Sequence, residues 1–259
     1  MLRETNDLIG LQVDATDGSI GKIKDVYTDR DQWRVRYFRV DTGSWLTDRD
    51  VLLSPASIRL LDWSSRKVLV TLTRIQVQNA PPVGASARIS RELEMALNRH
   101  YDWPNYWVGH GPKATISGVA APPASGAERR PRAGPRHAER TSAAMPGGEP
   151  YVGGATEMIG FHLQARDGEI GPIEGFIIDD NDWSCRYAVV DTSNPSGGKR
   201  VIVSPEWFET VDWNRSRITI DVGRDQVLHA PACDGRLTRE YETRLYHHYA
   251  RPVYWRRAA

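Results

Sequence analysis

The chain contains the same segment twice, and this repeat constrains its fold more than any other feature. Residues 9–42 read IGLQVDATDGSIGKIKDVYTDRDQWRVRYFRVDT, and residues 159–192 read IGFHLQARDGEIGPIEGFIIDDNDWSCRYAVVDT, without a gap between them. The offset of 150 positions persists at Asp62 and Asp212. Solenoid repeats have periods of about 20–50 residues, so this period indicates a duplicated domain. Residues found in both copies are the better candidates for a shared role.

A segment of different composition separates the repeats. Residues 111–155 are dominated by Gly, Pro, Ala, Ser and Arg and have few large apolar side chains, which is typical of disordered chain. We therefore expect one repeat with its helix and tail at 1–110, a disordered linker at 111–155, and a second repeat at 156–259. The linker carries a loose basic cluster formed by Arg129, Arg130, Arg132, Arg136 and Arg140. We interpret this cluster as solvated, with an arm that binds RNA or another anion as the alternative.

The overall charge gives no reason to expect a nucleic-acid or membrane surface. The chain has 34 Lys and Arg against 33 Asp and Glu, so no global basic field arises. No N-terminal apolar run is typical of a signal peptide, and no stretch reaches the roughly 18 apolar residues of a membrane span. We expect a soluble, cytoplasmic protein that reaches a membrane only through a partner. Cys185 and Cys233 are too few for a disulfide framework and are expected to be buried or incidental thiols.

Each repeat has the pattern of short strands. Gly18 and Gly168 lie between β-prone segments and predict a tight hairpin turn, because Gly adopts positive φ readily. Gly21 and Gly171 fall inside the next predicted strand, where Gly indicates a bulge or a close approach of two backbones. Further strands are expected in the first repeat at 33–41, 51–53, 58–62 and 68–72. The pattern predicts a mainly β fold with two small antiparallel barrels, each followed by one C-terminal helix and joined by the disordered linker.

Each predicted barrel is followed by an amphipathic helix and an aromatic tail. The helices are expected at 90–101 and 238–249, with Ser90 and Thr238 as N-caps. The candidate interface consists of the apolar helix stripes and the tail aromatics, namely Leu93, Leu97, Tyr101, Tyr106, Trp107, Tyr241, Leu245, Tyr249, Tyr254 and Trp255. Two interpretations stay open: these residues cover the end of their own barrel, or they form the contact between the barrels or with a partner.

A second group of residues is expected to have a structural role, because its members recur in both copies. They are Gly18, Gly21, Trp33, Asp41, Trp63, Gly168, Gly171, Trp183, Asp191 and Trp213. Trp33 opens a strand of its barrel and is expected to fill the core of that barrel. We therefore expect Trp33→Ala to unfold the first barrel and to leave the second folded.

The sequence contains no arrangement typical of catalysis or metal binding. No nucleophile–base pair and no Cys/His set with ligand spacing recur in the copies. Asp179, Asp180 and Asp182 resemble a calcium loop, but the required Gly and the closing Glu are missing. We expect a protein that is not an enzyme and has no cofactor and no metal.

The pattern IG…DGxIGxI…WxxRYxxVDT…SP, present in both copies, resembles the PRC-barrel domain. This domain forms the cytoplasmic part of the photosynthetic reaction-centre H subunit and the C-terminal domain of the ribosome-maturation factors. The resemblance covers residues 8–82 and 158–232. It implies a small, mostly antiparallel β-barrel that acts as an adaptor on a larger assembly. The H subunit carries a membrane anchor ahead of its barrel and the ribosome factor a different barrel, whereas only residues 1–7 stand there in this chain.

We interpret the sequence as a non-enzymatic adaptor with two PRC-barrels. The recurrence of stripe and tail indicates that the barrels pair with pseudo-two-fold symmetry through these residues and also dock on a protein partner of unknown identity. One alternative is a ribosome- or RNA-associated factor, which is disfavoured because no aromatic residues are interleaved with the linker arginines. The other is support of membrane electron transport, as in the H subunit.

Overall fold

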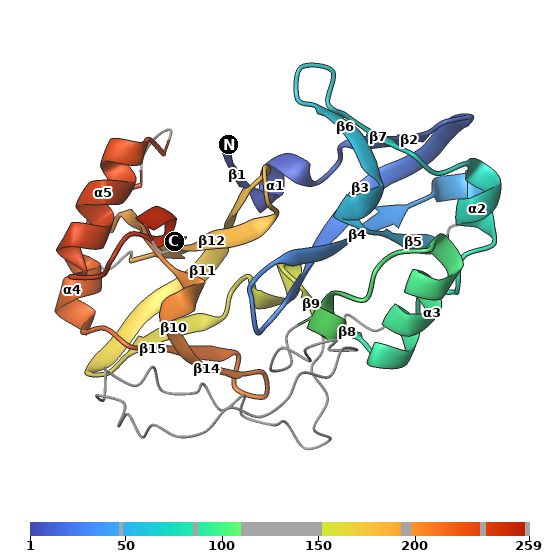
Figure 1. Ribbon diagram of the computed structural model, residues 1–259. Helices are drawn as coiled ribbons and strands as arrows, with labels where there is room; N and C mark the ends of the chain where they lie inside the picture. Colours follow the sequence, from blue (N-terminus) through green and yellow to red (C-terminus); the bar gives the residue numbers. More distant parts are fainter. Residues whose placement is uncertain (47–48, 85–87, 110–151, 193–197, 234–236, 257–259) are drawn as a thin grey trace, which may run out of the picture.

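The computed structural model describes residues 1–46, 49–84, 88–109, 152–192, 198–233 and 237–256. They form two β-rich halves that lie next to each other (Figure 1). The predicted linker falls outside the described residues except for its last four positions, and all five of its arginines lie in the part that is not described.

The first half contains a sheet in which six strands are hydrogen-bonded in sequence, together with short helices. Its strands are β2 (Gln12–Ala15), β3 (Gly18–Asp29), β4 (Val35–Asp41), β5 (Asp50–Leu53), β6 (Ile58–Asp62) and β7 (Lys67–Val70), in the order β5-β4-β3-β2-β7-β6. Its α-helices are α1 (Thr5–Leu8), α2 (Arg74–Gln78) and α3 (Arg91–Tyr101), and β8 (Arg88–Ile89) lies between α2 and α3.

The second half repeats this topology. Its strands are β10 (His162–Ala165), β11 (Gly168–Asp179), β12 (Ser184–Asp191), β13 (Arg200–Val203), β14 (Phe208–Asp212) and β15 (Arg217–Ile220), in the order β13-β12-β11-β10-β15-β14. The helices are α4 (Arg224–Leu228) and α5 (Arg239–His248). The predicted mainly β fold with one C-terminal helix after each barrel is confirmed. One pair in each half, β2 with β7 and β10 with β15, is parallel rather than antiparallel. In each half the parallel pair joins the first hairpin (β2–β3 or β10–β11) to the last hairpin (β6–β7 or β14–β15).

The glycines of the hairpin act as the sequence predicts. The β2–β3 register slips around Gly21, so that one residue of β3 is extra and a bulge forms. A Cβ on Gly21 would lie 1.9 Å from the carbonyl oxygen of Asp41, and a Cβ on Gly171 would lie 1.9 Å from that of Asp191. Both interpretations of this glycine, the bulge and the close backbone approach, are therefore confirmed.

The turn glycine has a second role that the sequence did not indicate. Gly18 has a φ of 147°, as expected, whereas no positive φ is found at Gly168. At both positions a Cβ would press on an arginine side chain, 3.1 Å from Cδ of Arg74 or 2.9 Å from Cδ of Arg224. These arginines begin α2 and α4, so the glycines allow each helix to pack on its hairpin.

The helices after the barrels begin where their caps predict. Ser90 Oγ accepts from the backbone N–H of Leu93 at 3.3 Å, and Thr238 Oγ1 accepts from that of Tyr241 at 3.2 Å. Each cap satisfies one of the otherwise unpaired N–H groups of the first turn. The predicted helices are therefore confirmed. Cys185 and Cys233 are buried and are not joined by a disulfide, as expected.

Candidate functional site: the contact between the two halves

Each half completes its sheet with a strand from the other half. β1 (Leu2–Glu4), at the start of the chain, pairs antiparallel with β11, and its first residue lies opposite Asp179. β9 (Val152–Gly154), which precedes the second barrel, pairs antiparallel with β3, and its first residue lies opposite Asp29. Both strands and both partners are 150 positions apart, the offset of the repeat. The two halves therefore exchange equivalent strands in the same register, with pseudo-two-fold symmetry (Figure 1).

Strand β9 corrects the predicted linker boundary at residue 155. Val152 is 0% exposed and Ala155 is 1% exposed, so the ordered second repeat begins at least four residues earlier. The glycines of this segment have the composition of a linker, but Gly154 is required by packing. A Cβ at Gly154 would lie 2.4 Å from Oδ2 of Asp25, a side chain of the first half.

Two tryptophans in left-handed backbone conformation cross between the halves. Trp33 has a φ of 53° and Trp183 a φ of 60°, a conformation that is strained for a bulky side chain. The carbonyl of Trp33 accepts from the N–H of Cys185 at 2.6 Å, and that of Trp183 accepts from the N–H of Val35 at 2.8 Å. These two bonds are again related by the offset of 150.

The rings of these tryptophans pack on the opposite half. The Trp33 ring lies 6.2 Å from Phe176 in a stacked arrangement and 5.3 Å from Phe208 edge to face. The Trp183 ring lies 5.1 Å from Phe38, also edge to face. The expectation that Trp33 belongs to the first barrel alone is therefore wrong. The left-handed turn between β3 and β4 brings its ring into contact with the second barrel.

Trp63 and Trp213 each contact a charged residue of the other half. Trp63 Nε1 donates to Oδ2 of Asp180 at 3.2 Å. At the equivalent place the guanidinium of Arg30 lies 4.3 Å from the centre of the Trp213 ring. Asp180 and Arg30 are 150 positions apart, so the same position carries opposite charges in the two copies. An aromatic N–H suits the carboxylate and the face of an aromatic ring suits the cation.

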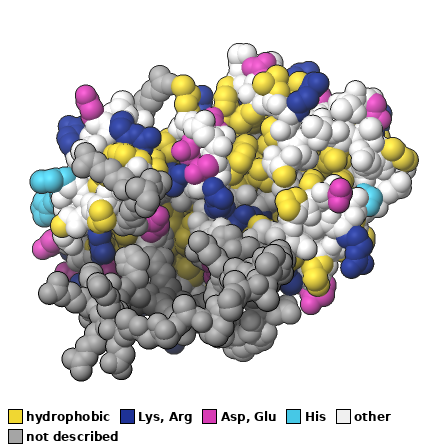
Figure 2. Space-filling model, viewed as in Figure 1, with side chains coloured by type: hydrophobic (Ala, Val, Ile, Leu, Met, Phe, Trp, Pro, Cys, Tyr) yellow, Lys and Arg dark blue, Asp and Glu magenta, His cyan; other side chains and the backbone are white. Residues whose placement is uncertain are grey.

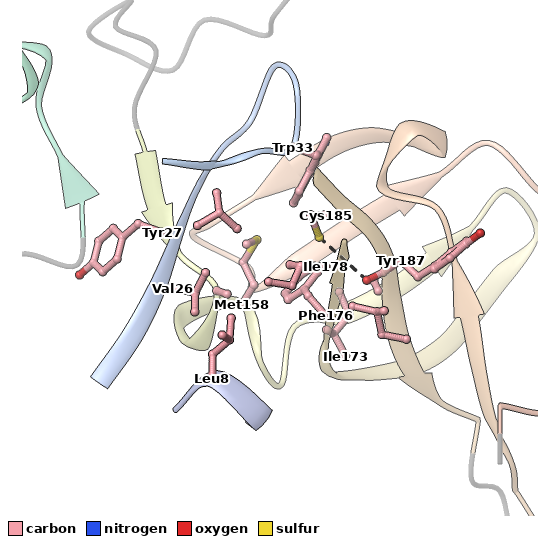
Figure 3. Close-up of a cluster of buried hydrophobic side chains, with 14 of the residues drawn as sticks. Leu8, Val26, Tyr27, Trp33, Met158, Ile173, Phe176, Ile178, Cys185 and Tyr187 are labelled. Atoms are coloured by element: carbon pink, nitrogen blue, oxygen red, sulfur yellow. Dashed lines mark hydrogen bonds between the residues drawn. The ribbon is translucent and has the colours of Figure 1, made fainter. Parts of the chain in front are cut away.

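Behind these contacts the apolar interior is continuous. The buried hydrophobic side chains of both halves form a single cluster. Figure 3 shows part of it, with Leu8 and Val26 from the first half and Met158 and Phe176 from the second. Figure 2 shows hydrophobic side chains gathered between the halves on the face in view. Since a contiguous core is the usual mark of one folding unit, the halves share packing as well as hydrogen bonds.

A buried carboxylate lies beside the exchanged strand β9. Asp25 is 8% exposed, and its Oδ2 accepts from Oγ1 of Thr156 at 2.6 Å. Its Oδ1 accepts from the backbone N–H of Val26 at 2.7 Å. Burial disfavours the charged form and raises the pKa of Asp25 above its ordinary value, although these hydrogen bonds act in the opposite direction.

The raised pKa of Asp25 predicts a pH-dependent cost to stability. Below the ordinary value near 3.8, the carboxyl is protonated in the folded and unfolded states. As the pH rises from there through the folded pKa, the unfolded state loses its proton first, and the free energy of unfolding falls. We expect Asp25→Asn, which keeps one of the two oxygen acceptors, to gain stability relative to the natural chain as the pH rises from about 3.8 through the folded pKa of Asp25. Urea unfolding of both proteins across this range measures it, and a constant difference would contradict it.

The predicted helix stripes and tails pack against their own half. Buried members are Leu97, Tyr101, Tyr241, Leu245 and Tyr249, and partly exposed members are Leu93, Tyr106, Trp107, Tyr254 and Trp255. The Tyr101 ring stacks 4.3 Å from Trp103, and Trp207 lies 4.7 Å from Tyr249. The residues that pair the halves are therefore different from the predicted stripe and tails. A role of the exposed members toward a partner stays a prediction.

A buried glutamate on each C-terminal helix holds the tail, and sequence reasoning missed it. Glu94, which is 0% exposed, accepts from the hydroxyl of Tyr106 at 2.8 Å and from that of Tyr37 at 3.3 Å. Arg91 lies 2.8 Å from its other oxygen. Burial raises the pKa of Glu94. The arrangement ties barrel, helix and tail together through one carboxylate.

The second half contains the same arrangement around Glu242. Tyr187 and Tyr254 donate to Glu242 at 2.7 and 3.0 Å, and Arg239 lies 3.1 Å away. The recurrence of Glu, Tyr and Arg in both copies was the available signal. A glutamate near the start of a helix is expected in any case, because its charge interacts favourably with the helix dipole. The recurrence of Glu94 and Glu242 therefore does not by itself indicate that their carboxylates are buried.

Two absences can be stated for the described residues. Within 1–46, 49–84, 88–109, 152–192, 198–233 and 237–256, no group of three or more His, Cys, Asp or Glu could hold a metal ion. In the same part of the chain, every helix is too short or too polar to cross a membrane.

Comparison with known proteins identifies the fold of the first half. No curated protein matches the chain. The sequence profile of the PRC-barrel domain matches residues 2–77, a segment that begins with the exchanged strand β1 and ends in α2. The second half has the same strand order, and its membership of the family stays a prediction. Residues 2–77 of this chain form a PRC-barrel domain.

Proposed function

We propose that the protein is a non-enzymatic adaptor whose two barrels dock on each other and offer their joint outer surface to a protein partner. The observation that carries this proposal is the reciprocal exchange of β1 and β9 in the same register. A symmetric dimer uses the same patch on both partners. Two repeats that use the same patch inside one chain correspond to such a dimer with its subunits covalently joined.

A PRC-barrel domain at residues 2–77 fits a protein-interaction or scaffold role, although a fold does not determine a function. The contact described above supports a rigid scaffold because backbone pairing, aromatic packing and one apolar cluster all act at the same place. The RNA-associated alternative rests on linker arginines outside the described residues. The electron-transport alternative rests on the family resemblance alone. Neither is favoured by a specific contact in the described part of the chain.

Cleavage of the connection between the halves tests the docking of the barrels. We expect a chain with a protease site inserted between residues 110 and 151 to stay one particle of unchanged mass after cutting, because the exchanged strands still join the pieces. Size-exclusion chromatography with light scattering measures this mass. Two particles of about half the mass after cutting would overturn the docking.

Two substitutions at equivalent positions sharpen this experiment: Gly154→Glu is the test variant and Glu4→Gly is its matched control. Gly154→Glu adds a side chain where Oδ2 of Asp25 lies 2.4 Å from the added Cβ, so the cut halves should separate. Glu4 is the equivalent position of the other exchanged strand, and its carboxylate makes a surface ion pair with Arg200 at 3.1 Å. Such pairs contribute about 0–1 kcal/mol, so Glu4→Gly should leave the cut halves together.

A further inference from the structure

The residue at the centre of the contact differs between the two halves. Arg34 and Ser184 are equivalent in the repeat and form a β-bridge with each other, so the pseudo-two-fold axis passes between them. Nε of Arg34 lies 3.5 Å from Oγ of Ser184, and its Nη2 lies 3.9 Å from Oδ2 of Asp182. On a two-fold axis a residue meets its own equivalent. Two copies of the first half would therefore bring two arginines together here, and two copies of the second half would bring two serines together.

A second difference lies at the last residue of each exchanged strand. The carboxylate of Asp25 fills the space beside Gly154, since a Cβ there would lie 2.4 Å from its Oδ2. The equivalents of these two residues in the other half of the contact are Gly175 and Glu4. A Cβ on Gly175 would lie 3.9 Å from the closest described atoms outside its chain neighbours. The glycine therefore stands on the exchanged strand in one case and on the sheet that receives the strand in the other.

A third difference is a reversal of charge near these positions. In the second half Arg200 pairs with Glu4 at 3.1 Å and with Glu174 at 2.8 Å. The equivalent of Arg200 in the first half is Asp50, which pairs with Lys24 at 3.3 Å. The sheet of the first half thus has a carboxylate where that of the second half has a guanidinium. The charge of Glu4 fits the second sheet only, because like charges on neighbouring strands are destabilising.

The three differences act together against a pair of two first halves. Strand β1 would then lie on β3, so Glu4 would meet the carboxylates of Asp25 and Asp50, and each contact would occur twice by symmetry. Arg34 would meet its own copy at the centre. A pair of two second halves has none of these contacts, because β9 on β11 would place glycine beside glycine and serine would meet serine.

We propose that the second half can pair with a second copy of itself through the face it turns to the first half, whereas the first half rejects its own copy. The proposal rests on the docking of the barrels described under the proposed function, and it names the partner that each face fits. Charge mismatch suppresses wrong partners more than it adds affinity for the right one. The unlike pair stays preferred, since it alone keeps the bond from Thr156 to Asp25 and the ion pair of Glu4 with Arg200.

The substitution Gly154→Glu should turn this difference into a change of partner. In the pair of unlike halves the new carboxylate meets Asp25. In a pair of second halves it takes the position of Glu4, beside Gly175 and Arg200, where a glutamate already fits. We expect this chain, cut next to residue 111, to give pairs of second halves and single first halves. Native mass spectrometry measures this, because the two pieces have different lengths and each kind of pair has its own mass.

Two additional variants control for association through another surface. Arg200→Asp, added to Gly154→Glu, places a carboxylate next to the new one and should weaken the pairs of second halves at least about fivefold. Glu4→Gly and Arg34→Ser, added to Gly154→Glu instead, remove the charges that obstruct two first halves. Pairs of first halves should then appear beside the pairs of second halves.

The natural chain provides a test that needs no substitution. After cutting and re-equilibration at low concentration, it should contain mostly unlike pairs and at least about tenfold more pairs of second halves than of first halves. Pairs of first halves in equal amount would overturn the proposal. Pairs of second halves that Arg200→Asp leaves at full strength would overturn it as well, because such pairs do not use this face.

The same samples separate this proposal from the docking of the barrels. If the pieces of the natural chain stay single, the docking itself is wrong. If they pair as unlike halves but Gly154→Glu gives no pairs of second halves, the docking stands and the choice of partner proposed for each face is wrong.

Discussion

Replacing Trp33 by alanine should lower the free energy of unfolding of the whole chain by about 3–5 kcal/mol, the usual cost of removing a packed tryptophan. Both halves should lose stability together, because the ring packs on Phe176 and Phe208 of the second half. Urea unfolding measures the total, and hydrogen exchange resolved by peptide measures each half separately. Protection lost only in residues 1–109 would contradict the shared core.

Trp45→Ala is the matched control for this experiment. Trp45 lies in the first half, is partly exposed, and has the guanidinium of Arg74 4.4 Å from its ring centre. A cation above an exposed aromatic ring contributes about 0.5–1 kcal/mol. We therefore expect Trp45→Ala to cost about 1 kcal/mol and to leave exchange in the second half unchanged. A cost equal to that of Trp33→Ala would mean that the location of the ring does not matter.

Gly21→Ala should prevent the first half from folding. The new methyl group would lie 1.9 Å from the carbonyl oxygen of Asp41, and this atom belongs to the neighbouring backbone and cannot turn away as a side chain does. The collision can be removed only if β3 separates from β4. We therefore expect the free energy of unfolding to fall by more than about 4 kcal/mol, a loss that single substitutions rarely reach. Circular dichroism and cooperative urea unfolding report the result.

Gly43→Ala separates steric collision from backbone strain. Gly43 has a φ of 53°, and no atom lies within 4 Å of an added Cβ. The left-handed conformation alone costs an L-residue about 1–2 kcal/mol. The Gly43 variant should therefore fold with a modest loss of stability. If Gly21→Ala behaved in the same way, the close approach to Asp41 would be absent in solution.

The parts of this fold that the sequence predicts are those encoded by local patterns. The bulge glycine, the helix caps and the strand pattern each depend on neighbours in the chain, and each was found. The identity of the strand beside β3 was not, because β1 and β9 occupy equivalent positions in the two repeats. Exchanging them leaves every local pattern unchanged. Backbone hydrogen bonds also carry no residue signature, and Gly153 and Gly154 have the composition of a linker.

The contact site was predictable only in part, for a related reason. Trp33 and Trp183 were identified by recurrence, but recurrence does not distinguish a ring packed in its own barrel from one packed in its neighbour. The left-handed backbone at these residues has no sequence signal, because tryptophan is not a residue that this conformation favours.

The exchange of strands also fixes an order of events during synthesis. When residue 109 has been made, the segment of β3 that pairs with β9 has no partner, because Val152–Gly154 is not yet synthesised. About 45 further residues must be added, which takes roughly 2–9 s at about 5–20 residues per second. Throughout this interval the first half carries both an unfilled edge and an unused strand β1. Strand β1 of another nascent chain does not fit this edge, because Glu4 stands at the position of Gly154, where a Cβ would lie 2.4 Å from Oδ2 of Asp25, so the edge stays open until the chain supplies its own β9.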